Sequence, residues 1–189
     1  MMKPTVYLVL AAFVAPVARA QAPALVPPQS PARASAAAPA LDDPTIVAIF
    51  DAANSWDMAT SQVALKKSRN EDVRQFAEMM VRDHRAVRQL GRDLAQKLGV
   101  TPTPPGREFA LALDHESTMK TLRRTTGRAF DRAYIDHEVA YHQAVIDAVT
   151  SQLLPATKNA ELRALEEKVA PNFVAHLAAA KQVQQKLSR

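Results

Sequence analysis

Four long segments of this chain carry an apolar stripe at helical spacing, and each stripe includes a histidine or an aspartate. Apolar residues that recur every three or four positions share one face of an α-helix, and that face packs against a core. The polar residues on the four stripes are Asp57, His84, His142 and His176. A polar group buried without a partner costs about 1–3 kcal/mol. These four side chains, the His/Asp cluster, are therefore expected to hydrogen-bond to one another, hold a water or bind a metal ion.

Capping signals predict where the helices begin. Asp43 and Asn70 are residues of the kind that commonly precede a first helical turn, and they are assigned to the starts of the first and second helices. The third helix is predicted over about 128–153 and the fourth over about 158–187, where Pro171 should produce a kink. The chain has only four glycines and no alternating strand pattern, so the predicted fold class is all-α.

The lengths of the connections predict the topology. About two residues join the first and second helices, and a short link joins the third and fourth, so each pair should be antiparallel. Roughly thirty residues separate the second helix from the third, including a proline-rich stretch at 101–106 and a short helix predicted at 108–122. This connection can travel the length of the bundle. We therefore expect a ferritin-like four-helix bundle with a long crossover that contains a short extra helix.

In this topology the His/Asp cluster should lie at one level. The depth of each cluster residue can be counted in residues from the end of the bundle where the first helix meets the second. At a rise of about 1.5 Å per residue, the four depths agree within roughly 5 Å. Imidazoles and a carboxylate are usual ligands of zinc, copper and non-haem iron. Glu138, Asp83 and Asn172 lie close to the histidines in sequence and are expected to support them from outside. The alternative is a buried hydrogen-bond network that fixes the helix register without a metal.

A di-iron centre is not expected. Such centres in ferritin-like bundles need Glu-x-x-His pairs on two helices and a carboxylate on each of the other two. The residues three positions before the cluster histidines are Val81, Val139 and Phe173. No catalytic residue is therefore assigned.

The first forty residues differ in composition from the rest. Residues 1–20 combine Lys3, a short apolar run and Ala18-Arg19-Ala20, which is typical of a secretory signal peptide cleaved after Ala20. Residues 21–41 are rich in alanine and proline and are expected to form a disordered tether. Residues 42–189 are predicted to form one domain. The expected location is the periplasm or the extracellular medium.

Charge and hydropathy limit the partners. Removal of residues 1–20 takes away Lys3 and Arg19, so the net charge falls from +5 to +3. This small excess does not favour nucleic-acid binding. No segment after the signal peptide is apolar and long enough to suggest a transmembrane span. The chain contains no cysteine, so neither disulfides nor a lipid-modified cysteine can stabilise or anchor it. The sequence is compatible with a protein partner or with attachment to the cell envelope, and it identifies neither.

Three of the helical segments also resemble a known family. Val73–His84 (VRQFAEMMVRDH), Phe130–His142 (FDRAYIDHEVAYH) and Pro171–Ala180 (PNFVAHLAAA), with Asn54–Leu65 before them, resemble the exported bacterial family called domain of unknown function 4142. The resemblance covers about residues 45–185. It implies a ferritin-like fold and export, and members are often described as outer-membrane proteins. It implies no particular reaction.

The cluster histidines fall inside these matching segments. Members of the family commonly carry glutamate where this chain has Asp57, whose side chain is shorter by one methylene. The sequence thus predicts an exported helical bundle that binds a single metal ion (zinc, copper or iron) through the His/Asp cluster. The alternative is a metal-free periplasmic bundle with a structural or partner-binding role, in which the cluster is only a buried hydrogen-bond network.

Overall fold

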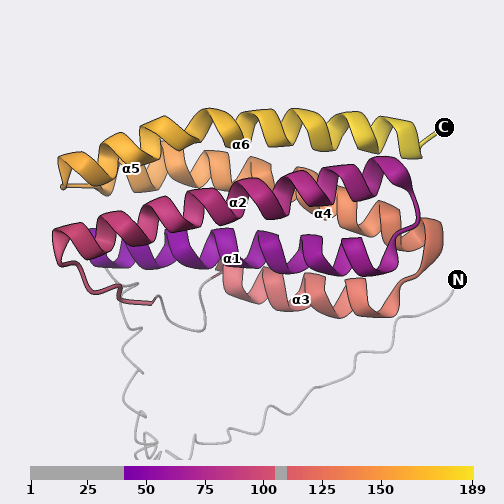
Figure 1. Cartoon of the computed structure of the whole chain (residues 1–189), viewed down its shortest axis with the longest axis horizontal. Coiled ribbons are helices and arrows are strands. Elements are labelled where there is room, and N and C mark those ends of the chain that lie inside the picture. The colour runs from indigo at the N-terminus through magenta and orange to yellow at the C-terminus, as the bar shows by residue number, and fades with distance from the viewer. Residues whose placement is uncertain (1–40, 105–109) are drawn as a thin grey trace, which may run out of the picture. The chain divides into compact units, whose positions relative to one another are not determined.

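A computed structural model describes residues 41–104 and 110–189, and all regular secondary structure in these ranges is helical. Four long helices form the bundle: α1 (Asp43–Lys67), α2 (Glu71–Leu98), α4 (Gly127–Ala148) and α6 (Ala160–Leu187) (Figure 1). The predicted signal peptide and nearly all of the predicted tether lie outside the described residues. The all-α bundle expected from the sequence is confirmed.

The crossover topology is also confirmed. Helix α3 (Ala110–Arg124) returns along the outside of the bundle against α1 and α4, so α4 begins at the end where α1 meets α2 (Figure 1). At that end Lys67 Nζ donates to the carbonyl oxygen of Leu122 at 2.7 Å, and Ser68 Oγ donates to Asp131 Oδ1 at 2.6 Å. As a result α2 runs parallel to α4 and antiparallel to α1.

The start of α1 differs from the sequence prediction by one residue. The N-cap is Asp42, whose Oδ1 accepts the backbone N–H of Thr45 at 2.9 Å. The carboxylate of Asp43 instead accepts the N–H groups of Lys158 and Asn159 at 2.9 and 3.0 Å. Two adjacent aspartates can both satisfy helix-terminal N–H groups, and only the three-dimensional fold shows that Asp43 serves the turn before α6.

The third predicted helix is not continuous. It is α-helical to Ala148, widens into the π-helical turn η1 (Val149–Leu153) and ends as the three-residue segment α5 (Leu154–Ala156). The hydroxyl of Thr150 donates back to the carbonyl oxygen of Ile146 at 2.9 Å, a bond that competes with regular helix bonding. Pro155 has no N–H to donate to the preceding turn. Both features favour the wider turn.

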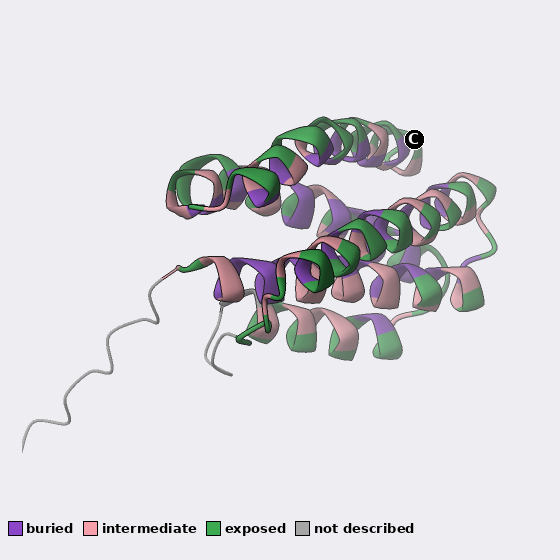
Figure 2. Ribbon diagram, turned by 60° about the vertical axis from the view of Figure 1, so that its left-hand side comes forward, coloured by how far each residue is buried: buried purple, intermediate pink, exposed green. Residues whose placement is uncertain are grey.

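The core lies between the four long helices, and the buried residues face inward (Figure 2). Near the α1–α2 turn it includes Phe76, Met80 and Tyr134. Toward the opposite end it includes Phe50 and Phe173. The His/Asp cluster lies between these two apolar layers, because its residues lie between them along every long helix. Among the described helices, none has the length and hydropathy needed to cross a membrane.

Candidate metal centre

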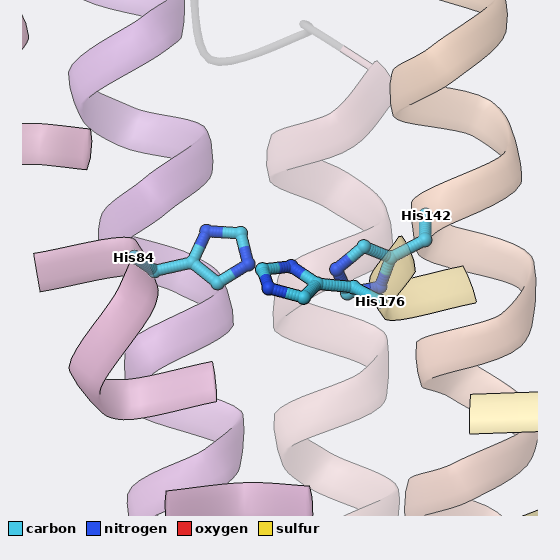
Figure 3. A group of neighbouring side chains, drawn as sticks. All are labelled: His84, His142 and His176. Carbon is cyan, nitrogen blue, oxygen red and sulfur yellow. The ribbon is translucent and has the colours of Figure 1, made fainter. Parts of the chain in front are cut away.

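Each long helix contributes one side chain to the His/Asp cluster. Asp57 comes from α1, His84 from α2, His142 from α4 and His176 from α6, and each residue is at most 4% exposed. Figure 3 shows the rings of His84 and His142 extending toward each other, with the ring of His176 beside them. Their ring centroids are 5.1 to 5.6 Å apart. The expected common level of the cluster is confirmed.

One atom of each side chain faces the centre of the cluster. Asp57 Oδ2 lies 3.3 Å from His84 Nε2 and 3.6 Å from His142 Nε2, so this short carboxylate reaches the histidines. One ring nitrogen from each of the three histidines lies within 4.8 Å of the other two. Asp57 Oδ2, His84 Nε2, His142 Nε2 and His176 Nδ1 are buried and have no hydrogen-bond partner among the described residues. The three ring nitrogens therefore form one group, and the carboxylate oxygen adjoins two of them, without being satisfied by the protein.

The other nitrogen of each ring is held by a partner on the outside. His84 Nδ1 is 2.9 Å from Asn54 Oδ1, and His142 Nδ1 is 2.9 Å from the carbonyl oxygen of Glu138. His176 Nε2 is 3.1 Å from Asp83 Oδ2. Each partner atom is an acceptor, so each neutral ring carries its proton on the outer nitrogen. The inner nitrogen then presents a lone pair to the centre, which is how metal-binding histidines are oriented in proteins.

The amide orientation of Asn54 follows from a separate contact. Asn54 Nδ2 donates to the carbonyl oxygen of Phe50 at 2.7 Å, which leaves Oδ1 to face His84. The sequence analysis did not assign Asn54 a role, although it lies three residues before Asp57 on the same helix. A polar residue one turn from a buried ligand on a buried face was the signal that could have identified it.

Carboxylates and hydroxyls surround the side of the cluster nearest the α1–α2 turn. Ser61 Oγ lies 3.5 Å from Asp57 Oδ1, so the second carboxylate oxygen, Oδ2, is the one that faces the histidines. Glu138 is fully buried; its Oε1 accepts from Thr60 Oγ1 at 3.1 Å, and its Oε2 lies 3.5 Å from His142 Nδ1. Two buried carboxyl groups therefore lie on this side of the centre.

Burial sets the protonation of the cluster. It raises the pKa of Asp57 to about 7, because the ionised carboxylate is desolvated. Burial and the nearby charge of Asp57 raise the pKa of Glu138 well above its ordinary value. Burial lowers the pKa of His142 to about 4 and that of His84 well below its ordinary value. At neutral pH these rings are uncharged, which is the form that binds metal ions.

Two of the three predicted supporting residues take part. Asp83 holds His176, and Glu138 holds His142 through its backbone carbonyl. The prediction for Asn172 is wrong, because this side chain is exposed. The buried face of α6 extends from His176 toward Leu177, and Asn172 lies on the opposite flank of that face.

The remaining two histidines, His115 and His137, lie outside the centre. His115 stacks on Trp56 with ring centroids 5.5 Å apart, and His137 Nδ1 is 3.2 Å from Thr118 Oγ1. Both contacts attach α3 to the bundle. Neither histidine belongs to a group of potential metal ligands in the described part of the chain.

Comparisons with known proteins agree with this fold. The solved structure described as CopM in the Cu(II)-bound form is similar to this chain, with a TM-score of 0.58 and 17% sequence identity. The similarity covers 77% of this chain and 98% of that one, and at this identity it shows a shared fold. No curated protein matches the chain. The sequence pattern of the domain of unknown function DUF4142 matches residues 28–183, which include the whole His/Asp cluster. The chain therefore belongs to the DUF4142 family.

Proposed function

We propose that this protein binds a single transition-metal ion between its four long helices, through Asp57, His84, His142 and His176. Four buried, unsatisfied lone-pair atoms support this assignment. The three ring nitrogens form one group, and Asp57 Oδ2 lies 3.3 Å from His84 Nε2 and 3.6 Å from His142 Nε2. A network that existed only to satisfy itself would pair these atoms with donors, because each unpaired buried group costs about 1–3 kcal/mol. A cation at the centre would satisfy all four atoms at once.

Copper is the first choice of metal. Three imidazoles and one carboxylate suit zinc, copper and iron, and nitrogen and oxygen sites bind Cu²⁺ more tightly than the other divalent first-row ions. The similar fold of CopM, which was solved with Cu(II), supports the same choice. Zinc is the second choice, because a four-ligand set of this kind also fits its tetrahedral preference.

The site is suited to holding an ion. The outer partners of His84 and His142 are buried with them, so these rings are positioned before an ion arrives. Preorganised ligands bind with little further ordering cost. We therefore assign the protein a role in metal binding, and assign no reaction to it.

We further propose that the protein acts after export. The basic start, apolar run and Ala18-Arg19-Ala20 sequence support cleavage after Ala20. Residues 21–41 would then connect the bundle to a partner or to the envelope. N-terminal sequencing of the exported protein should find Gln21 as the first residue, and a mature protein that still begins at Met1 would refute this proposal.

Metal titration of the purified, metal-free protein tests the main proposal. We expect one equivalent of Cu²⁺ to bind with electron paramagnetic resonance signals from imidazole nitrogens. The His142→Ala variant should lose this binding and keep its helical circular dichroism. The matched control is His137→Ala on the same helix, which should bind copper normally because His137 contacts Thr118 outside the centre.

Failure of the wild-type protein to bind a metal ion would refute the proposal. If the wild-type protein takes up none of Cu²⁺, Zn²⁺ or Fe²⁺, the proposal is wrong and the cluster is a metal-free buried network. In that case His142→Ala should still lower the free energy of unfolding, by about 1–3 kcal/mol, because it breaks a buried polar contact.

A further inference from the structure

The two sides of the His/Asp cluster differ in chemistry. The side toward the α1–α2 turn holds the carboxyl groups and hydroxyls of Asp57, Glu138, Thr60 and Ser61. The opposite side is reached by moving back along α1 and forward along α4, which run antiparallel. There the side chains are almost all aliphatic or aromatic.

A small cavity lies on this apolar side. Its volume is about 40 Å³, and it is bordered by His84 and His142 themselves. The rest of its wall is mostly apolar and includes Phe50, Val145 and Phe173. The cavity therefore directly adjoins the centre on the side away from Asp57.

Apart from His84 Nε2 and His142 Nε2, which face the centre of the cluster, the polar groups around the cavity are already paired. Tyr141, which also lines it, donates its hydroxyl to the carbonyl oxygen of Ala53 at 3.0 Å. The amide of Asn54 is bonded to Phe50 and His84. A charged ligand would find no free donor here. With a metal ion on the two free ring nitrogens, a water would lack the two to four polar partners that it needs to be stable in a cavity. A small neutral molecule fits the wall chemistry better.

The π-helical turn η1 forms part of the same wall. Val149 and Leu153, its first and last residues, both line the cavity. π-Helical turns inside helices occur frequently at functional sites. The departure of α4 from regular geometry thus coincides with the cavity beside the proposed metal.

We propose that this cavity binds a small neutral diatomic molecule, of the class of dioxygen, carbon monoxide or nitric oxide, beside the metal ion. This inference rests on the proposed metal site. Asp57, His84, His142 and His176 would hold the ion, and the diatomic molecule would lie in the cavity that His84 and His142 border. A volume of about 40 Å³ is suited to a molecule of two heavy atoms.

Carbon monoxide and xenon test the proposal. Carbon monoxide is added to protein loaded with Cu⁺ without oxygen, and its infrared stretching band reports binding to the metal. Xenon is added to metal-free protein, and the methyl resonances of Val145, Val149 and Leu153 report occupation of the cavity. Apolar cavities of this kind bind xenon.

Variants that fill the cavity test whether carbon monoxide and xenon bind at this position. Ala148→Val adds two methyl groups to the cavity wall, and Ala144→Val adds the same groups to an exposed position one turn earlier on α4. We expect the first variant to weaken binding of carbon monoxide and xenon by about tenfold or more, since an occupied cavity resists insertion of further atoms. The second should have no effect. Ala53→Val fills the cavity from α1 and replaces Ala148→Val if that variant does not fold.

The outcomes separate this inference from the metal proposal. Copper binding without a carbon monoxide band, or equal affinity for carbon monoxide in all variants, overturns the inference and leaves the metal site standing. Absence of xenon shifts at the cavity methyls also overturns it, with no metal involved. Failure of the wild-type protein to bind any metal overturns the proposed function, and the inference with it.

Discussion

The amide of Asn54 and the imidazole of His84 meet across the α1–α2 interface, with 2.9 Å between Asn54 Oδ1 and His84 Nδ1. The carbonyl oxygen of Phe50 holds the amide in this orientation. Asn54 therefore determines which nitrogen of His84 carries the proton, and so which nitrogen presents a lone pair to the centre of the cluster.

Replacement of Asn54 by alanine should weaken metal binding. His84 would lose its outer acceptor, and the affinity for Cu²⁺ should fall by about 10–100-fold, the usual cost of removing such a partner. Competition with a chelator measures the dissociation constant. Ser55→Ala is the control, since Ser55 is bonded to the carbonyl oxygen of Asp51. Unchanged affinity in Asn54→Ala would show that the amide does not orient His84.

Replacement of Asp83 by alanine should have a smaller effect than replacement of Asn54. Asp83 holds His176 at 3.1 Å, but its side chain is 29% exposed, so a water can take over as acceptor. We expect a loss of copper affinity at the lower end of the 10–100-fold range. Arg82→Ala, which removes only the ion pair to Asp83, should leave the affinity unchanged. A larger loss in Asp83→Ala than in Asn54→Ala would contradict this order.

Metal binding should depend on pH chiefly through Asp57. A metal ion binds the ionised carboxylate, and burial raises the pKa of Asp57 to about 7 in the metal-free protein. Binding must therefore displace a proton below that pH, and the affinity should fall as the pH drops from about 8 to about 5. The histidines contribute only further down, because burial lowers the pKa of His142 to about 4. Calorimetric titrations in buffers of different ionisation enthalpy would count the displaced protons. An affinity that is constant between pH 8 and pH 5 would refute this role of Asp57.

Replacement of Gly91 by alanine should destabilise the bundle. A Cβ atom on Gly91 would lie 2.8 Å from Cδ1 and Cε1 of the Phe50 ring, so the ring or the α1–α2 spacing must shift. Overpacking of this kind typically costs about 1–3 kcal/mol, which denaturant unfolding would measure. The second substitution Phe50→Leu should recover part of the loss, since it removes the clashing atoms. Simple additivity of the two losses would show that the contact is not the cause.

Much of this fold could be predicted from the sequence because the signals are local. The spacing of apolar residues placed His84, His142 and His176 on buried faces, and the connection lengths fixed the direction of α4. The common level of the cluster followed from these two facts and the constant rise of an α-helix. The membership of the DUF4142 family agrees with the motifs around these histidines.

The errors concern features that depend on tertiary packing. Asn172 lies one turn before His176, but sequence spacing does not say which flank of His176 the bundle covers, and that flank is the one with Leu177. Asn54 was missed because its role depends on a neighbour in another helix. The π-helical turn was missed because hydrophobic periodicity hardly changes over five residues.

The burial of the His/Asp cluster has a consequence for exchange kinetics. All four residues are at most 4% exposed, and each belongs to a different helix. An ion held there would leave slowly while the helices stay together, because no ligand atom faces the solvent. Its residence time would follow the rate at which the bundle opens, so tight packing of α1, α2, α4 and α6 would slow release even for an ion of modest equilibrium affinity.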